Sequence, residues 1–316
     1  MPNVMLSVVA IGQNEAPNIP RLAASIKALK QYAPFEIETI FIDSASTDNS
    51  YDLASEFFDN VTLLDESRHL CASSSRFAGT LEAKFDWIFY VDADMEICPD
   101  FFEPLFEFVQ SEQHWAGLIG VYFHHFDNGR IAAQSFSHST TKPDAALQFG
   151  GASVLRRRAV IMAGNWDPCV YGKEEMELYA RLGNGEPVVK FVGVPMIKHF
   201  TEHYTRPQLI MRLLTPAGGA GKVFWGYGQA IRALSIKGKL MALVKLDTKP
   251  YVVWSVIILL LAVSPFLGLG MSLALFASSL AAFSFWLRPG TVFRYLALPL
   301  SLASGWFKYF SSFRPR

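Results

Sequence analysis

An uncharged run near the carboxyl terminus limits what this chain can fold into. From Tyr251 to Leu287 there is no Asp, Glu, Lys or Arg, so the run is about 37 residues long, whereas one membrane-spanning helix needs roughly 20. Residues 264–270 interrupt the run with proline and glycine, which end helices. We therefore expect a transmembrane helical hairpin at about 251–265 and 270–287. The alternative is a buried core hairpin of a soluble protein.

The formal net charge of zero conceals an uneven distribution of charge along the chain. Residues 1–204 carry 15 Lys and Arg against 27 Asp and Glu, residues 205–250 carry 8 against 1, and residues 288–316 carry 5 against none. Because Lys and Arg are enriched in cytoplasmic loops, we expect both ends of the uncharged run to be cytoplasmic. We expect anionic lipid headgroups to hold the basic residues of the middle segment: Arg206, Arg212, Lys222, Arg232, Lys237, Lys239, Lys245 and Lys249.

These patterns divide the chain into three parts. Residues 1–204 form an α/β domain, residues 205–250 a basic juxtamembrane or interfacial segment, and residues 251–316 a membrane region. Residues 295–307 could be interfacial, re-entrant or a third span. The adjacent hairpin favours lipid over nucleic acid as the partner of the basic segment, so we expect a multi-pass protein of the cell membrane whose α/β domain is cytoplasmic. Three cysteines without Cys-x-x-Cys spacing fit a reduced compartment.

Two carboxylates follow directly on an apolar run. The run is residues 87–91, and Asp92 and Asp94 come next with one alanine between them. If the run is a buried strand, the pair lies where the strand leaves the sheet, which is where open α/β folds bind ligands. Paired oxygen donors suit Mg²⁺ or Mn²⁺, which in turn can hold phosphate oxygens. The alternative is an acidic turn without a ligand.

The first 200 residues alternate strand-like and helix-like patterns, as in one α/β domain. A first strand over residues 6–11 is followed by a helix whose Leu22, Ile26 and Leu29 share one face. A second strand over residues 37–42 ends at Asp43, and the polar residues after it are suited to cap a helix that begins near Asn49. Asp43 stands at a strand's carboxyl end, within reach of a ligand over the sheet.

Four segments together resemble the inverting glycosyltransferases of family 2, which have the nucleotide-sugar-dependent GT-A fold. The resemblance extends from Ser7 to about His199. Its segments are the opening strand with Asn14 and Glu15, the second-strand segment 42–48, the metal motif 90–94, and the acidic helix that runs from residues 171–178 to Arg181. It implies a mixed sheet flanked by helices, a nucleotide-sugar donor and a divalent cation, Mn²⁺ or Mg²⁺.

The resemblance implies roles for donor-binding residues. Asp43 would hydrogen-bond the nucleobase, and the backbone around Ile11, Asn14 and Glu15 would line the nucleoside pocket. Arg76 would reach a phosphate, although the family often has Arg-Asn where this chain has Arg76-Phe77. By family habit a UDP-sugar is favoured as the donor, with a GDP-sugar open.

The resemblance also implies roles in metal binding and catalysis. Asp92 would lie near the ribose and the metal, Asp94 would be the direct metal ligand, and His199 would complete the metal shell unless it is an ordinary structural histidine. Glu175 fits the base that takes the acceptor's proton, with Glu174 as the alternate. The family commonly has Asp at the base position. One of the two glutamates is expected merely to favour the start of its helix through the helix dipole.

The combined prediction is an inverting glycosyltransferase that moves one sugar to a lipid or lipid-linked acceptor at the cytoplasmic membrane face, in cell-envelope polysaccharide or glycolipid biosynthesis. Two alternatives remain: a catalytically inactive membrane scaffold that binds a nucleotide-sugar, and a metal-dependent nucleotidyltransferase. The sequence lacks Gln-x-x-Arg-Trp after the acidic helix, which argues against a processive synthase. His124 and His125 are expected at a strand edge or loop, without metal-ligand spacing.

Overall fold

The computed structural model describes most of the chain in ten segments. They are residues 4–32, 35–65, 70–111, 114–136, 142–205, 208, 219–246, 249–263, 266 and 269–286. The predicted segment 295–307, and Arg206 and Arg212 of the basic segment, lie outside the described residues.

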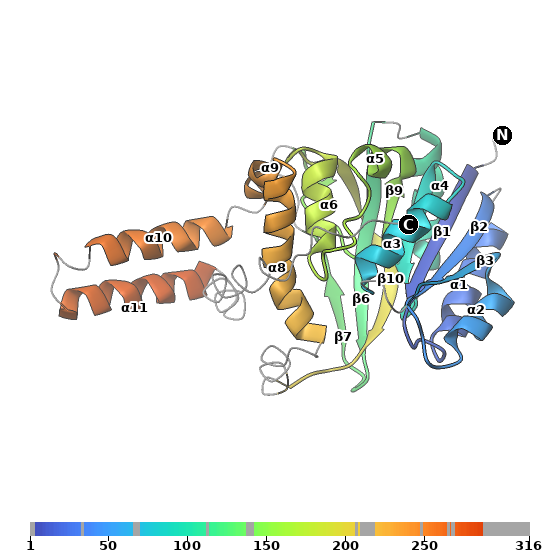
Figure 1. The fold of residues 1–316 in the computed structure, drawn as a ribbon, viewed down its shortest axis with the longest axis horizontal. Helices are drawn as coiled ribbons and strands as arrows, with labels where there is room; N and C mark the ends of the chain where they lie inside the picture. Colours follow the sequence, from blue (N-terminus) through green and yellow to red (C-terminus); the bar gives the residue numbers. More distant parts are fainter. Residues whose placement is uncertain are drawn as a thin grey trace.

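One mixed sheet forms the centre of the α/β domain (Figure 1). Its main path runs β3-β2-β1-β4-β9-β6-β10-β5, and β7 and β8 pair with β6 and β10. Strands β1 to β4 pair in parallel, whereas β9 is antiparallel to both of its neighbours, so the predicted mixed sheet is confirmed. The strands are β1 Val4–Gly12, β2 Phe35–Asp43, β3 Asn60–Leu63, β4 Trp87–Asp92, β5 Met95–Ile97, β6 Gly117–Phe126, β7 Ile131–Gln134, β8 Ala145–Ala146, β9 Ser153–Arg156 and β10 Val189–Thr201.

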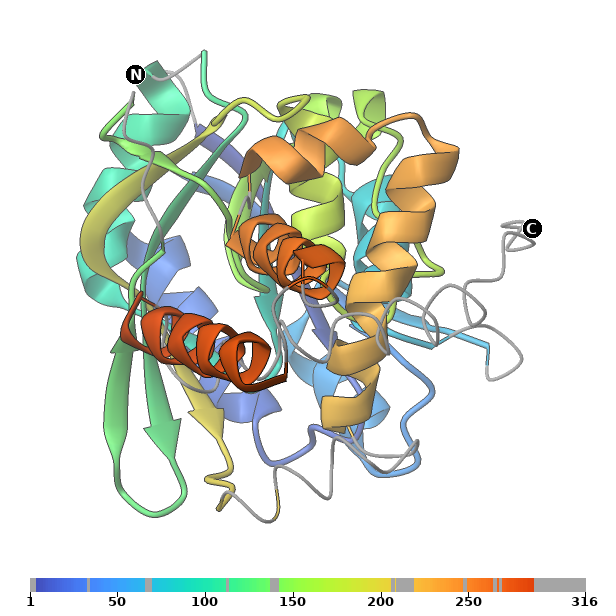
Figure 2. The same ribbon diagram turned by 90° about the vertical axis from the view of Figure 1, so that its left-hand side faces the viewer.

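Helices flank the sheet and continue beyond it (Figures 1 and 2). They are α1 Ile19–Tyr32, α2 Ser50–Phe57, α3 Ala72–Glu82, α4 Phe102–Ser111, α5 Arg157–Met162, α6 Glu174–Leu182, α8 Gly219–Ile236, α9 Leu240–Leu246, α10 Lys249–Val263 and α11 Leu269–Trp286, with a 3-10 turn at Pro99–Phe101. The α/β fold with flanking helices is therefore as predicted.

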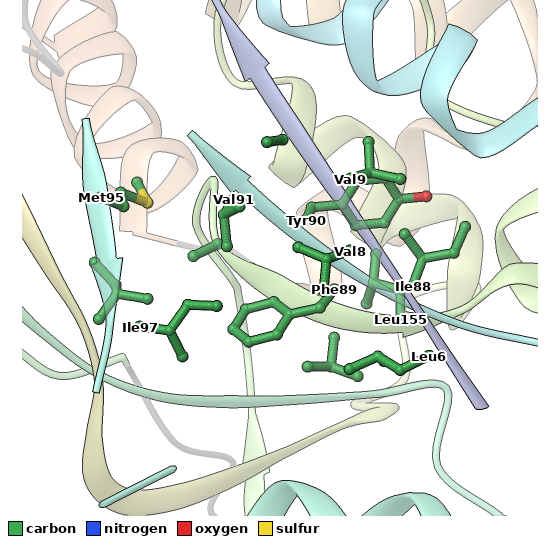
Figure 3. Packing of buried hydrophobic residues seen from close by; sticks show 14 of the residues in the cluster. Leu6, Val8, Val9, Ile88, Phe89, Tyr90, Val91, Met95, Ile97 and Leu155 are labelled. Atoms are coloured by element: carbon green, nitrogen blue, oxygen red, sulfur yellow. The ribbon is translucent and has the colours of Figure 1, made fainter. Parts of the chain in front are cut away.

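The central strand β4 is apolar on both faces because both are covered. Successive side chains of a strand point to opposite faces. Phe89 packs on Phe101, before α4, with ring centroids 5.8 Å apart. Tyr90 instead meets Thr80 of α3, with the two hydroxyls 2.7 Å apart, and packs on Trp166. Helices α3 and α4 thus cover opposite faces of β4, and Figure 3 shows the apolar layer that β4 shares with β1 and β5.

Helix α1 forms where the spacing of apolar residues predicts it. Leu22, Ile26 and Leu29 recur on one face and are 0–3% exposed, and burial of each stabilises the fold by roughly 1.5–3 kcal/mol. The Ser25 hydroxyl is buried on the same side and accepts the Ile97 amide hydrogen at 3.1 Å. Helix α1 therefore fixes β5, the strand that follows the paired aspartates.

The first helix of the basic segment packs against the α/β domain. Gly226 of α8 lies so close to Gly172 that an added Cβ would be 2.1 Å from the Gly172 carbonyl oxygen. The Lys237 ammonium, just after α8, lies 2.6 Å from Asp167 and 2.9 Å from the fully buried Glu177. The prediction that lipid headgroups hold Lys237 is therefore wrong: its charge compensates two carboxylates of the domain.

Helix α9 also contacts the domain. The Lys239 ammonium donates to the Asn184 side-chain oxygen at 3.0 Å, and Lys245 lies 3.8 Å from Glu186. Apolar residues of α8 and α9 form a buried cluster with α6: Ala180, Leu234, Ala242 and Leu243. The boundary predicted at residue 204 thus separates segments that share a core.

Two helices form a hairpin that projects from the α/β body (Figures 1 and 2). They are α10 and α11, close to the predicted spans at about 251–265 and 270–287. Among the described residues, no helix has both the length and the hydropathy needed to cross a membrane.

The contact between Gly226 and Gly172 predicts a reversal of the usual effect of replacing a helical glycine. Gly→Ala inside a helix ordinarily stabilises by roughly 0.5–1 kcal/mol. We expect Gly226→Ala to destabilise instead, by about 1–3 kcal/mol, because the methyl group overpacks the site. The measurement is urea denaturation of the full chain. Gly270→Ala is the control, because an added Cβ there meets no atom of the described residues within 4 Å. Equal stabilisation by both variants would contradict the contact.

Candidate active site

The carboxyl ends of three parallel strands bring the predicted site residues to one edge of the sheet. In the register of β1, Gly12 is paired with Asp43 of β2, and Ile11 with Asp92 of β4. The chain passes from β1 to β2 on one side and pairs with β4 on the other, which creates the crevice where open α/β sheets bind ligands. Asp43 and Asp92 therefore lie at the same edge of the sheet, as expected from their places at strand ends.

A pocket of about 250 Å³ opens at this edge. It is lined by the turn after β1, the start of α3, the residues around the paired aspartates and one residue before α6: Ile11, Gly12, Gln13, Glu15, Ser44, Leu70, Cys71, Ala72, Asp92, Ala93, Asp94 and Tyr171. Four predicted site residues, Ile11, Glu15, Asp92 and Asp94, are among them. Burial, followed by the charges of Asp94 and Asp92, raises the pKa of Glu15, although its hydrogen bond to Asn18 lowers it.

Asn14 and Asp43 are adjacent in the sequence to residues that line the pocket. Asn14 has a positive φ of 58° and accepts the Thr47 amide hydrogen at 2.8 Å, which ties the turn after β1 to the segment after β2. Asp43 has no exposed surface, and its Oδ1 accepts the Ser46 amide hydrogen at 2.6 Å. The other oxygen of Asp43, Oδ2, is buried without a hydrogen-bond partner in the described part of the chain. Neither residue lines the pocket in this structure.

Arg76 connects the metal motif to the acidic helix. Its side chain, 2% exposed, places Nη2 2.7 Å from Asp92 Oδ1 and Nη1 3.1 Å from Glu174 Oε1. The guanidinium also lies 5.1 Å from the ring centroid of Trp166. Arg76 is predicted to reach a phosphate, but it does not line the pocket. Its observed contacts orient two carboxylates that are 82 residues apart in the sequence.

The two glutamates at the start of α6 have different surroundings. Glu174 is buried, and burial together with the charge of Glu175 raises its pKa to about 8, because Arg76 is shared with Asp92 and only partly offsets these effects. Glu175 is half-buried and makes no direct hydrogen bond or ion pair within the described segments. Lys173, just before the helix, has a φ of 65°, a left-handed conformation that sets the direction of this turn.

Asp94 and His199 form a second pair beside the pocket. His199 Nε2 lies 3.0 Å from Asp94 Oδ2, while Asp94 Oδ1 is buried without a hydrogen-bond partner among the described residues. Burial lowers the pKa of His199, but the hydrogen bond and the charge of Asp94 raise it above its ordinary value. His199 lies within β10, which continues to Thr201.

This pair fits a divalent cation. Two ligands about 2.1 Å from one ion, at right angles, lie about 3.0 Å apart, which is the separation observed between His199 Nε2 and Asp94 Oδ2. Carboxylate oxygen suits Mn²⁺, and neutral imidazole is the commonest metal ligand among side chains. Within the described ranges, no three His, Cys, Asp or Glu side chains are grouped to hold a metal by themselves. A cation here would therefore take further ligands from a substrate or water, as Mg²⁺ commonly does.

Several contacts at this edge carry no clear sequence signal. A Cβ added to Gly151 would lie 2.5 Å from Asp92 Oδ2 and 2.8 Å from Arg76 Nη2, so a side chain here would displace the ion pair. The Tyr171 amide donates to Gln229 of α8 at 2.9 Å. Cys71 lines the pocket, and burial raises the pKa of its thiol to about 11. For the close contact at Gly151, the sequence offers one sign, which is a pair of glycines before an apolar run.

Comparison with known proteins identifies the domain. The family model described as Glycosyl transferase family 2 matches residues 7–161. Together with the mixed sheet and its flanking helices, this match shows that the chain carries a glycosyltransferase family 2 domain with the GT-A fold. No curated protein matches the chain.

Solved structures share the fold at low sequence identity. Mannosyltransferase PcManGT from Pyrobaculum calidifontis, in complex with GDP-Man and Mn²⁺, has a TM-score of 0.57 at 15% identity, over 96% of this chain and 86% of that chain. S. aureus TarS 1-349 has a TM-score of 0.52 at 15% identity, over 96% and 88%. Against a longer TarS structure the chain spans 43% of that protein. GalNAc-T7 with UDP, GalNAc and Mn²⁺ has a TM-score of 0.51 at 15% identity, over 73% and 48%.

The raised pKa of Glu174 predicts a pH dependence of stability. In the unfolded chain this carboxyl ionises near 4.5, whereas in the folded protein it stays protonated up to about 8. Between these values the unfolded chain binds fewer protons, so the free energy of unfolding falls as pH rises. Glu174→Gln cannot titrate, and we expect its stability to fall less with pH over this window.

The measurement is urea denaturation between about pH 5 and about pH 9, without metal or donor. Glu186→Gln is the control, because Glu186 is 67% exposed and its removal should leave the wild-type slope. Parallel pH profiles for wild type and Glu174→Gln would contradict the assignment.

Proposed function

We propose that the chain is an inverting glycosyltransferase that transfers one sugar from a nucleotide-diphosphate donor, with a UDP-sugar favoured, to a lipid or lipid-linked acceptor. The observation that carries this proposal is the Asp94–His199 pair, which borders the pocket at the strand ends. One buried carboxylate oxygen of the pair has no hydrogen-bond partner within the described ranges. The GT-A domain and the Mn²⁺ complexes of PcManGT and GalNAc-T7 support it.

The donor would lie along the pocket between the turn after β1 and the start of α3. Ile11, Glu15, Asp92 and Asp94 line the pocket; Ile11 and Glu15 would be at the nucleoside end, and Asp92 and Asp94 at the diphosphate end. Asp94 and His199 would hold Mn²⁺ or Mg²⁺, with Asp92 nearby. When bound, the cation would neutralise negative charge on the leaving diphosphate. Arg76 holds Asp92 in a fixed orientation, so that this carboxylate faces the donor without reorganising.

Glu175 is our choice for the base. Glu174 contacts Arg76, and its raised pKa keeps it protonated near neutral pH. A general base must instead be deprotonated, so that it can accept a proton from the acceptor hydroxyl or phosphate. Glu175 is half-buried and free of direct ion pairs within the described segments. Glu174 then serves to fix the first turn of α6 through Arg76.

The helical hairpin supports an acceptor that is confined to a membrane. Large apolar side chains on and between α10 and α11 are 36–86% exposed: Val252, Ile258, Leu259, Leu261, Val263, Phe266, Met271, Leu273, Leu275 and Phe276. A contiguous exposed apolar surface marks an interaction with another apolar phase. We propose that the hairpin enters the cell membrane with both ends on the cytoplasmic face, which keeps the site near a lipid-linked acceptor.

The enzymatic proposal is tested by nucleotide release from UDP-, GDP- and TDP-sugars with Mn²⁺ and a lipid extract as acceptor. We expect release with one donor, a loss of at least 100-fold in Asp94→Ala, and a loss of about 10²–10⁴-fold in Glu175→Gln because general bases contribute this much. Glu175→Gln should still bind Mn²⁺ and UDP. Binding of the nucleotide without release from any donor would favour an inactive scaffold instead.

The membrane proposal is tested by flotation of the full chain with vesicles of phosphatidylethanolamine and phosphatidylglycerol. We expect wild type to float with the vesicles, and the double variant Leu259→Glu, Leu273→Glu to remain in the bottom fraction, because a charge inside the bilayer costs several kcal/mol. Met162→Glu is the matched control: Met162 is 76% exposed on the α/β domain and its variant should float. Equal flotation of all three proteins, or none by wild type, would contradict the proposal.

A further inference from the structure

A row of four hydrogen-bonded side chains leads away from the candidate metal pair. His199 Nδ1 lies 2.9 Å from His124 Nδ1, and His124 Nε2 lies 2.6 Å from Gln134 Oε1. The row is thus Gln134, His124, His199 and Asp94, contributed by β7, β6, β10 and the turn after β4. It places a second histidine behind His199, on the side away from Asp94.

The donors and acceptors of this row determine where the hydrogens lie. Gln134 Oε1 can only accept, so the hydrogen of the contact lies on His124 Nε2. A neutral His124 then has its lone pair on Nδ1, and His199 must donate from its own Nδ1. When neutral, His199 with its hydrogen on Nδ1 presents the lone pair of Nε2 to Asp94.

We propose that His124, oriented by Gln134, is a positioning residue that makes His199 a metal ligand by accepting its Nδ1 hydrogen. This inference rests on the proposed metal-dependent function and deepens it. Metal-binding histidines commonly donate their other ring nitrogen to a neighbouring acceptor, which fixes the tautomer and the ring orientation. Here the acceptor is a second imidazole, itself held by an amide oxygen.

The row also explains what happens when the acceptor is missing. Without His124 Nδ1, a neutral His199 can carry its hydrogen on Nε2 and donate it to Asp94 Oδ2, 3.0 Å away. That hydrogen bond would occupy His199 Nε2 and Asp94 Oδ2, the two atoms that would otherwise bind the cation. The positioning residue therefore acts on metal affinity, before any step of sugar transfer.

The test is Mn²⁺ affinity, measured by electron paramagnetic resonance of free Mn²⁺ in titrations of the full chain, with and without UDP. His124→Leu removes the acceptor and should weaken Mn²⁺ binding by about 10–100-fold, the usual effect of losing such a partner. His124→Asn keeps an acceptor oxygen near the position of Nδ1 and should stay close to wild-type affinity. Wild-type affinity in His124→Leu, or equal losses in both variants, would overturn the proposal.

A second pair of variants, at Gln134, tests which ring nitrogen of each histidine carries the hydrogen, without replacing either histidine. The ammonium of Gln134→Lys can only donate, so His124 must accept on Nε2 and carry its hydrogen on Nδ1, which forces the hydrogen of His199 onto Nε2. We expect Mn²⁺ binding to weaken as in His124→Leu, whereas Gln134→Glu should retain it. Ser135→Lys adds the same charge at the next exposed residue; an equal loss there would show a general charge effect and overturn the proposal.

Asp94→Ala separates this inference from the proposed function. If wild type binds Mn²⁺, Asp94→Ala does not, and His124→Leu binds as wild type does, the positioning role is wrong while the metal site stands. If wild type binds no Mn²⁺ with or without UDP, the metal-dependent function fails, and the positioning role fails with it.

Discussion

The ion pairs of Arg76 hold the candidate active site together. One guanidinium, buried under Trp166, contacts Asp92 at the end of β4 and Glu174 at the start of α6. Loss of Arg76 would leave the Asp92 carboxylate without its cation and would remove the contact with the buried Glu174 carboxyl. The distance between the donor edge and the acidic helix therefore depends on this side chain.

The acidic helix needs support from its other side as well, and α8 provides it. Gly226 packs on Gly172, Gln229 accepts the Tyr171 amide, and Lys237 compensates Asp167 and Glu177. These contacts join the basic segment to the loop that precedes α6. The segment between the α/β domain and the apolar hairpin thus supports the candidate active site through packing. A protein truncated after residue 204 would lose these contacts. Loss of activity in that truncated protein would therefore not be evidence that the enzyme needs a membrane.

The sequence predicted what depends on local pattern, and missed what depends on long-range contacts. The periodicity of Leu22, Ile26 and Leu29 predicted α1, and the apolar run before Asp92 predicted a buried strand with carboxylates at its end. The pairing of His124 with His199 arises from the register of β6 with β10 across 75 residues, and the charge of Lys237 gave no sign that its partners were carboxylates rather than lipid. The roles of Asp43 and Arg76 toward a donor, and of Glu175 toward an acceptor, stay predictions.

The most direct test of the metal site is anomalous diffraction at the manganese edge from crystals grown with UDP and Mn²⁺. We expect one strong peak bonded to Asp94 and His199, with the diphosphate of UDP beside it and Arg76 still in contact with Asp92 and Glu174. UDP bound in the pocket with no manganese at these side chains, or with manganese bound elsewhere, would contradict the central claim.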